Sequence, residues 1–280
     1  LHLVVDGDAV SGLTAAYYLR KAGHSVTVYD KMEKAGGMLQ YAIPNYRLPK
    51  HYVDDVAAAI EGMGVRFELG KELGKDIDAA KLEAEYDKVF YATGAWKRPV
   101  LGFDGEEFTE FGLQFLVEVN KWMNKKKREN VIVIGGGNVA MDVAVTAKRL
   151  GAKTVTLVFR KPENELSASR EEIERAKEEG VQIMPQWGVK RALYKDDQIT
   201  GMELKRTFYT RDENGKLVLH YDEDDTTVVN ADSVLMAAGQ RVDLSFLGER
   251  YESARGRLVV EGESQETSHK GVYALSLIHI

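Results

Sequence analysis

The fold of this chain is decided by the stretch Val131-Ile-Val-Ile-Gly-Gly-Gly-Asn-Val-Ala140. Its first four residues are apolar and β-branched, which predicts a buried strand. A helix-like stretch follows to Leu150, and a second apolar run occupies residues 155–159. A strand, a glycine turn, a helix and a second strand within about 30 residues are typical of a dinucleotide-binding unit.

Each small residue of this turn has a mechanical reason. Gly135 lets the backbone leave the strand sharply, Gly137 lets it approach a pyrophosphate, and Ala140 lets the helix pack closely on the strand. The helix start then presents unpaired N–H groups and a partial positive charge to the phosphates. These residues therefore form a candidate diphosphate site that needs no basic side chain.

The N-terminus repeats this plan about 128 residues earlier. The apolar run 3–5 leads into a loop that ends at Gly12, followed by a helix-like stretch to Ala22 and a β-branched run at 26–29. The candidate cofactor-binding residues of this loop are Gly7, Ala9, Ser11 and Gly12. Two matching copies indicate two dinucleotide sites more strongly than one glycine-rich loop would.

The residues that end the second strand of each copy distinguish the two ligands. Asp30, followed by Lys31, lies 18 residues after Gly12 and can accept hydrogen bonds from a ribose diol. Arg160 and Lys161 end the other strand, where a guanidinium can bind a 2′-phosphate. The basic unit is therefore predicted to take NADP(H), which leaves the adenosine half of FAD for the acidic unit. The alternative for Arg160 and Lys161 is that they only begin a solvated loop.

Composition excludes several classes of protein. The chain has 280 residues, a net charge of −6, no cysteine and a mean hydropathy of −0.32. It lacks the apolar run of about 18 residues that a membrane helix needs, and its charge offers no attraction to nucleic acid or anionic lipid. Without thiols it can hold no thiolate-bound iron–sulfur cluster. Six scattered histidines suggest no metal site. We expect a cytoplasmic protein that performs redox chemistry with bound cofactors.

Five segments carry a family resemblance. They are residues 36–49, 86–96, 135–144, 159–161 and 238–240, which include Gly-Gly-Met-Leu-Gln-Tyr-Ala-Ile-Pro at 36–44 and Tyr-Ala-Thr-Gly-Ala-Trp at 91–96. Together they resemble the small subunit of NADPH-dependent glutamate synthase and related FAD- and NAD(P)-binding oxidoreductases. The matches run through nearly the whole chain.

The resemblance implies an α/β fold with two Rossmann-like domains, in which an NADP-binding domain is inserted into a discontinuous FAD-binding domain. The first part of the FAD domain would be residues 1–99, the connection 100–127, the inserted domain 128–235, and the second FAD part 236–280. Because the chain begins with Leu1 and ends in an apolar stretch, we expect a fragment. It would lack the family's N-terminal iron–sulfur domain and its C-terminal flavin segment.

The resemblance also implies further cofactor-binding residues. These are Gly37, Met38, Leu39 and Arg47 at the flavin, Thr93 and Gly94 at the domain crossover, Asn138, Val139 and Asp142 beside the nicotinamide nucleotide, and Ala238 and Gly239. In the family, FAD accepts a hydride from NADPH and electrons pass to iron–sulfur clusters. The implied partner is an iron–sulfur domain or subunit that accepts the electrons, and a glutamate synthase large subunit is one candidate. Since the cofactors perform this chemistry, no catalytic side chain is expected.

The first loop departs from the family pattern. Ala9 replaces a glycine, so its methyl group is expected to obstruct the pyrophosphate, and Asp6 and Asp8 place two carboxylates nearby. At the other end, residues 275–277 replace a segment that contacts the flavin in relatives. These departures favour an alternative function, in which the chain is a nucleotide-binding scaffold or an NADPH sensor that has lost its flavin.

Alternating runs between residues 202 and 229 predict β-hairpins. Turn-forming residues occur at 213–215 and at 222–225, and we expect a turn at each.

Overall fold

The computed structural model describes residues 1–7, 9–122, 126–254 and 256–275. It divides into two compact units. Unit 1 contains Leu1–Lys97 and Arg241–Ile280, and unit 2 contains Arg98–Gln240. Unit 2 is therefore an insertion in the sequence of unit 1. None of the helices in the described ranges is both long and apolar enough to cross a membrane.

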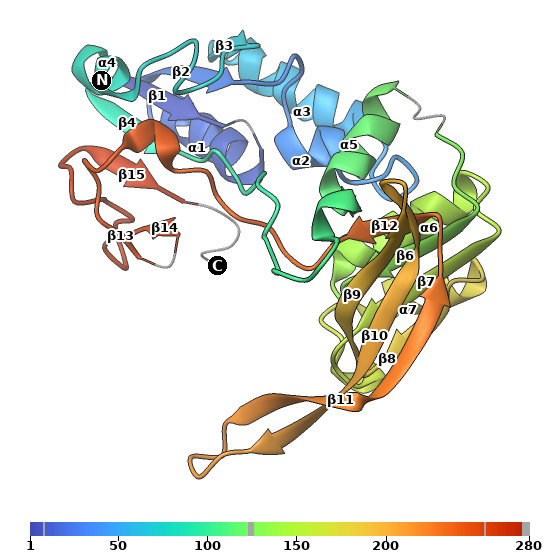
Figure 1. Cartoon of the computed structure of the whole chain (residues 1–280). Helices are drawn as coiled ribbons and strands as arrows, with labels where there is room; N and C mark the ends of the chain where they lie inside the picture. The colour runs from blue at the N-terminus through green and yellow to red at the C-terminus, as the bar shows by residue number, and fades with distance from the viewer. Residues whose placement is uncertain (8, 123–125, 255, 276–280) are drawn as a thin grey trace. The chain divides into compact units, whose positions relative to one another are not determined.

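Unit 1 is built on a five-stranded parallel sheet (Figure 1). In spatial order its strands are β15 (Val272–Ala274), β4 (Lys88–Tyr91), β1 (His2–Asp6), β2 (Ser25–Asp30) and β3 (Arg66–Leu69). Its helices are α1 (Val10–Lys21), α2 (Gly37–Tyr41), α3 (Lys50–Gly62) and α4 (Ala79–Glu85), and a two-stranded ribbon is formed by β13 (Ser253–Ala254) and β14 (Arg257–Leu258). A short 3₁₀ helix covers Ser245–Leu247.

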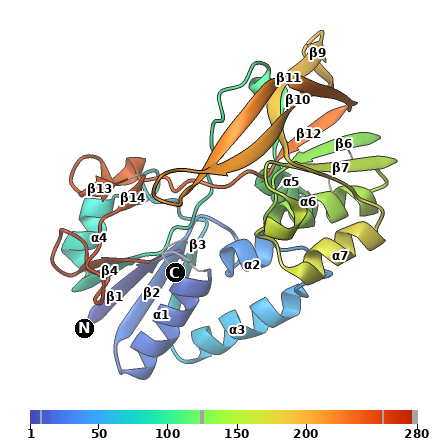
Figure 2. The ribbon, with the colours of Figure 1, turned by 90° about the horizontal axis from the view of Figure 1, so that it is seen from below.

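Successive side chains of β1 point to opposite faces of the sheet, so unit 1 has a hydrophobic core on each face. Val5 packs with Leu13 of α1 and Ile60 of α3, and Figure 2 shows these two helices side by side. Val4 packs on the other core, with Leu82 of α4 and Leu258 of β14. A strand buried on both faces is the central strand expected of a parallel sheet.

Unit 2 has a second five-stranded parallel sheet and a three-stranded antiparallel sheet. The parallel strands, in spatial order, are β5 (Glu110–Phe111), β12 (Ser233–Met236), β6 (Asn130–Ile134), β7 (Thr154–Phe159) and β8 (Gln182–Pro185). The antiparallel strands are β9 (Trp187–Lys195), β10 (Gln198–Arg211) and β11 (Leu217–Asn230). The helices are α5 (Gly112–Trp122), α6 (Asn138–Arg149) and α7 (Arg170–Glu178), with 3₁₀ turns at Glu106–Phe108 and Glu163–Glu165.

Both predicted strand–turn–helix–strand units form. In unit 1 they are β1, α1 and β2, and in unit 2 they are β6, α6 and β7. The first two strands of each repeat pair in parallel at the centre of their sheet. The predicted α/β class, with two Rossmann-like domains of which one is inserted into the other, is therefore confirmed.

The segment 100–127 differs from its prediction as a connection. Within it, β5 pairs in parallel with β12, and α5 buries Leu113, Phe115 and Leu116. The apolar residues at 113, 116 and 117 follow the helical period, and burying them ties this segment to unit 2. Unit 2 also extends past residue 235 to Gln240. Ala238 and Gly239 therefore belong to unit 2, whereas the predicted boundary placed them in the second FAD part.

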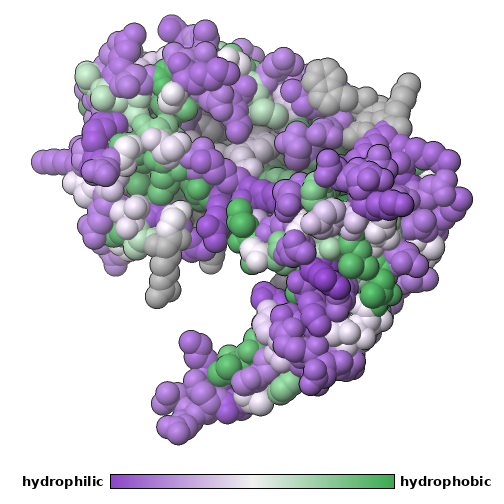
Figure 3. Space-filling view, viewed as in Figure 1, coloured by the Kyte–Doolittle hydropathy of each residue, from purple (hydrophilic) through white to green (hydrophobic). Residues whose placement is uncertain are grey.

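Strands β10 and β11 form the long hairpin of unit 2. The turn predicted at 213–215 joins them. The second predicted turn, at 222–225, is wrong because these residues form an irregularity within β11. Figure 3 shows mostly hydrophilic side chains at the end of this hairpin, with a few apolar ones among them. The exposed apolar residues there are Phe208, Leu217, Val218 and Tyr221.

Candidate dinucleotide-binding sites

The glycine turn of unit 1 joins β1 to α1 and admits only glycine at its two ends. Gly7 has φ +101°, and a Cβ on it would lie 2.2 Å from the carbonyl oxygen of Ala92. A Cβ on Gly12 would lie 1.7 Å from the carbonyl oxygen of Gly7. The first turn of α1 contains no acidic residue, and among the described residues no side chain caps its start. Its amide groups are thus arranged to meet an anion.

Ala9 precedes α1 and faces another glycine. A Cβ built on Gly37, at the start of α2, would lie 2.7 Å from the Ala9 methyl carbon. The methyl group therefore lies against the bare backbone of Gly37. The Ala9 side chain, which departs from the family pattern, is accommodated because residue 37 is a glycine, as in the family pattern. Ser11 lies half-buried in the first turn of α1.

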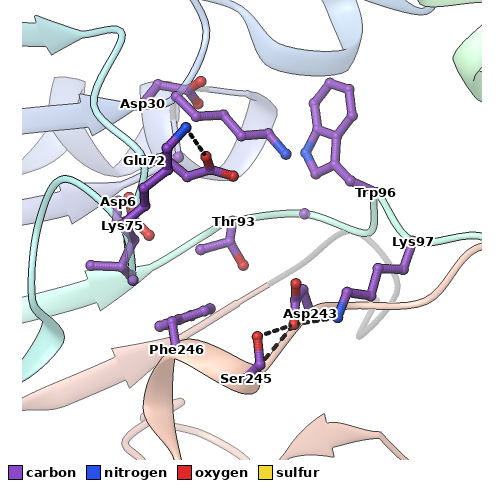
Figure 4. A pocket seen from close by; sticks show the side chains of 15 residues that line it. Asp6, Asp30, Glu72, Lys75, Thr93, Trp96, Lys97, Asp243, Ser245 and Phe246 are labelled. Atoms are coloured by element: carbon purple, nitrogen blue, oxygen red, sulfur yellow. Dashed lines mark hydrogen bonds and ion pairs between the residues drawn. The ribbon is translucent and has the colours of Figure 1, made fainter.

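A cavity of about 480 Å³ opens at the carboxyl ends of β1, β2 and β4 (Figure 4). This volume is in the range of small-molecule sites. Five of the predicted cofactor-binding residues line it, namely Gly7, Asp30, Lys31, Thr93 and Gly94. The structure therefore brings together residues from three separate sequence segments at one edge of the sheet. Ligands of parallel sheets bind at this edge.

Charged side chains on the cavity wall are mostly paired. The Glu72 carboxylate lies 3.6 Å from Lys75 Nζ, and Asp243 lies 2.8 Å from Lys97 Nζ. Lys31 Nζ lies 4.7 Å from the centre of the Trp96 ring. Asp30, at the end of β2, accepts a hydrogen bond of 2.7 Å from the Met32 amide through Oδ1. That bond orients the carboxylate predicted to bind a ribose.

Asp6 is a buried carboxyl group on the wall of this cavity. It is 4% exposed, and its Oδ2 has no hydrogen-bond partner among the described residues. Burial raises the pKa of Asp6 to about 8; the negative charge of Asp30 adds to this rise and Lys31 opposes it. The site therefore favours the protonated, neutral form of Asp6, which weakens the charge repulsion expected from the sequence. Asp8 lies outside the described residues.

The other residues predicted at the flavin lie apart from this cavity wall. Gly37 is buried, and Met38, Leu39 and Arg47 are half-buried on α2 and the segment after it. The Lys50 ammonium group donates to the Leu39 carbonyl oxygen at 2.7 Å, which holds the end of α2 against the start of α3. The part of these four residues in flavin binding stays a prediction.

The glycine turn of unit 2 has the same construction. A Cβ on Gly135 would lie 2.3 Å from the carbonyl oxygen of Ala237, so only glycine fits between β6 and β12 at this point. Gly137 precedes α6, and Ala140 is fully buried in its first turn. No acidic residue lies in that turn. Val139 is half-buried, and Asp142 is buried one turn further on.

The segment after β7 lies beside this turn. The Ser167 hydroxyl donates to the Gly136 carbonyl oxygen at 3.3 Å, and Asn138 Oδ1 accepts from the Ser169 amide at 2.9 Å. Asn138 is therefore held in place by a backbone group 31 residues further along the chain. Ser167 and Ser169 could not be predicted at this site, because neither belongs to a recognisable motif.

Arg160 and Lys161 are exposed directly after β7, next to the turn that follows β6. The Arg160 guanidinium donates to the Tyr221 hydroxyl of β11 at 3.3 Å, and the Arg160 carbonyl oxygen accepts from the Thr207 hydroxyl at 2.7 Å. Ala238 and Gly239 are exposed after β12, on the other side of β6. The glycine turn after β6, Arg160 and Lys161 after β7, and Ala238 and Gly239 after β12 thus lie at the same edge of the sheet.

The cavity of unit 1 also contains residues that no motif indicated. They come from residues 72–75 and 243–246, and from Lys97. Only the fold places them beside the glycine turn, because 243–246 follow the insertion of unit 2. Trp96 had a signal in the sequence, since it directly follows the Ala-Thr-Gly-Ala segment at 92–95.

Comparison with known proteins agrees with this construction. Residues 1–276 match the model of the pyridine nucleotide-disulphide oxidoreductase family. The chain is 34% identical over 279 residues to the beta subunit of the NADP(+)-dependent formate dehydrogenase of Moorella thermoacetica, covering 97% of this chain and 40% of that one. It is 34% identical over 250 residues to the glutamate synthase [NADPH] small chain of Halomonas elongata, covering 85% and 53%. The chain thus spans about half, or less, of these relatives.

A solved structure shows the same fold. FprA of Mycobacterium tuberculosis, in complex with NADPH, superposes with a TM-score of 0.82 and 14% identity, covering 98% of this chain and 78% of that one. The resemblance to the glutamate synthase small subunit is confirmed by the relatives, and the fold is shared with this oxidoreductase. With the family match extending over nearly its whole length, the chain belongs to the pyridine nucleotide-disulphide oxidoreductase family.

Proposed function

We propose that this chain is the cofactor-binding part of an NADPH-dependent flavoprotein oxidoreductase, with FAD in unit 1 and NADPH in unit 2. One observation carries the proposal. Each unit places a glycine turn between a central parallel strand and a helix start. The next strand ends in Asp30 in unit 1 and is followed directly by Arg160 in unit 2. The family match supports the oxidoreductase class.

The residues of unit 1 fit the adenosine diphosphate half of FAD. The turn from Gly7 to Gly12 and the start of α1 would bind the diphosphate, and Asp30 would accept hydrogen bonds from the ribose diol. The bound flavin would supply the hydride acceptor. The protein holds it in place and needs no general acid or base for this transfer.

The residues of unit 2 fit NADPH better than NADH. Gly135, Gly137 and the start of α6 would bind the diphosphate. Arg160 would bind the 2′-phosphate, and the hydrogen bond to Tyr221 holds its guanidinium at the same edge of the sheet. Lys161 adds a second positive charge there.

Electrons leaving the flavin need a further acceptor. The chain has no cysteine, so a thiolate-bound iron–sulfur cluster would belong to another domain or subunit. The relatives are named as a beta subunit and a small chain, which supports a partner of this kind. A glutamate synthase large subunit is one such partner. We propose that the protein is located in the cytoplasm. Fractionation of cells that contain the full-length protein would test this location.

An ultraviolet–visible spectrum of the purified chain, recorded with and without added FAD, tests the proposal. We expect a flavin spectrum that persists after removal of free FAD, and NADPH-dependent reduction of an artificial dye. A colourless protein that still binds NADPH would contradict it. That result would favour the nucleotide-binding scaffold or NADPH sensor, the alternative that the departures at Asp6 and Ala9 suggest.

A further inference from the structure

Asp6 lines the unit 1 cavity, and the proposed function gives its buried carboxyl group no role. It ends β1, directly before the glycine turn, and pairs with Tyr29 of β2 and Tyr91 of β4. Its side chain is 4% exposed and lines the cavity. Buried polar atoms in native proteins almost always have a partner. Within the described part of the chain Asp6 Oδ2 has none, which leaves this atom for a ligand bound in the cavity.

The charged and titratable groups around Asp6 come from several elements. Asp30 ends the neighbouring strand β2, and Lys31 follows it. On the other side, the Tyr91 hydroxyl of β4 is occupied by a hydrogen bond of 3.0 Å to Glu83. The cavity also contains two ion pairs, Glu72 with Lys75 and Lys97 with Asp243.

We propose that Asp6 is a further dinucleotide-binding residue that meets the cofactor as a neutral carboxylic acid and donates a hydrogen bond to an oxygen at its diphosphate–ribose end. This inference rests on the proposed binding of FAD in unit 1. A protonated carboxyl group has one O–H donor, whereas an ionised one can only accept. An ionised Asp6 would leave the ligand oxygen without its donor and add a negative charge beside a diphosphate.

The affinity for FAD therefore depends on the proton of Asp6. Burial, with the nearby charge of Asp30, raises the pKa of this carboxyl group to about 8. Below that pH the binding form predominates, and above it the proton must be taken up before FAD can bind. Because one proton is linked to binding, the Kd for FAD should rise about ten-fold between pH 7 and pH 9.

The test measures the Kd for FAD by quenching of flavin fluorescence, with the full chain, at pH 7 and pH 9. In Asp6→Asn the amide keeps a donor without titrating, so the Kd should stay within about two-fold across this range. The matched control is Asp55→Asn on α3, which removes one exposed carboxylate outside the cavity and should retain the pH dependence of the native chain.

A second variant separates donation from loss of charge. Asp6→Val places an apolar side chain at the end of β1. Its Kd for FAD at pH 7 should be about ten-fold weaker than that of Asp6→Asn, since valine has no hydrogen-bond donor. NMR titration of the side-chain carboxyl carbons, with Asp6→Asn identifying the signal, measures the proton without any cofactor. Adding FAD should move that titration to higher pH.

The outcomes distinguish this inference from the proposed function. If FAD binds the native chain and Asp6→Asn with the same pH dependence, or if Asp6→Val binds as well as Asp6→Asn at pH 7, the inference is overturned and FAD binding stands. If neither the native chain nor any variant binds FAD at pH 7, both are overturned.

Discussion

At the scale of single residues, the ligand preference of unit 2 depends on Arg160. Arg160→Ala should raise the KM for NADPH about ten-fold or more, because hydrogen bonds to a charged group contribute about 1.5–3 kcal/mol. The KM for NADH should hardly change. Steady-state dye reduction with each nucleotide measures this. Arg149→Ala is the control, since it removes the same charge from the far end of α6. Equal losses with NADPH and NADH would contradict the assignment.

A second prediction concerns the close approach of α1 to β1. In Gly12→Ala the new methyl group would lie 1.7 Å from the Gly7 carbonyl oxygen, so backbone atoms must move. We expect a loss of at least about 2 kcal/mol in the free energy of unfolding. Gly62→Ala, at the end of α3, meets no atom within 4 Å and should be neutral or slightly stabilising. Denaturant unfolding compares the two. A tolerant Gly12→Ala would refute the packing argument.

Sequence alone identified the residues that follow backbone rules. Gly7, Gly12 and Gly135 could be predicted because each must be bare where two chain segments nearly touch. The positions of Asp30 at the end of β2 and of Arg160 directly after β7 could be predicted from their spacing after the glycine turns, and their part in binding stays a prediction. The raised pKa of Asp6 could not be predicted, because a pKa depends on burial and on neighbours from other strands. For the same reason nothing indicated that Ala9 faces Gly37.

At the scale of elements, the segment 100–127 shows what pattern analysis missed. Its short strand β5 has only two residues, too few for a periodic signal. Arg128 attaches it to the sheet: its guanidinium donates to Glu110 of β5 at 2.7 Å and to Ser233 of β12 at 3.3 Å, and stacks over Phe115 of α5. These contacts hold β5, β12 and α5 together.

Arg128→Met should therefore destabilise unit 2, by about 1–3 kcal/mol in thermal unfolding at pH 7. Burial tends to raise the pKa of Glu110, but hydrogen bonds from Lys126 and Arg128 outweigh it and lower the pKa. A lowered pKa contributes stability above the unfolded value that disappears as pH falls. The difference in stability between the native chain and Arg128→Met should therefore become smaller as the pH falls. Lys127→Ala, an exposed neighbour, should show no measurable change. A pH-independent difference would count against the ion pair.

The irregularity in β11 has a local cause. Asp222 Oδ1 accepts from the amides of Asp224 and Asp225, at 3.0 and 3.2 Å. This is the turn-forming behaviour on which the sequence prediction relied. It did not produce a hairpin turn because β11 continues to pair with β10 on both sides of it. The sequence indicated the turn-forming hydrogen bonds of Asp222. It did not show that β10 and β11 pair on both sides of this residue, which makes the local turn a bulge within the strand.

At the scale of the whole molecule, each unit has a sheet and a core of its own. We predict that residues 98–240, produced alone, fold with a single cooperative transition and bind NADPH without FAD. Their helices and strands pair within the unit, and its ends do not interrupt the sheet. Calorimetry and NADPH titration check both points. An unfolded product would show that unit 2 depends on the remainder of the chain.

The duplication made the whole-molecule prediction possible. Two copies of one supersecondary plan indicated two domains, and the family resemblance supplied the insertion. The unit boundaries do not follow from this duplication, because they depend on which sheet each short segment joins. Unit 2 runs from Arg98 to Gln240. Its first part is attached by the two-residue strand β5, which pairs with β12, and a strand this short has no sequence signature.

The chain leaves unit 1 after Lys97 and returns to it at Arg241, and these two residues pair through backbone hydrogen bonds of 2.9 Å in both directions. The exit and the return are therefore neighbours. A few residues of glycine and serine would be enough to join them once the intervening domain is excised. The nucleotide-binding domain of another family member could be joined at Lys97 and Arg241 in the same way. The nucleotide preference of the chain would then be exchanged together with that domain.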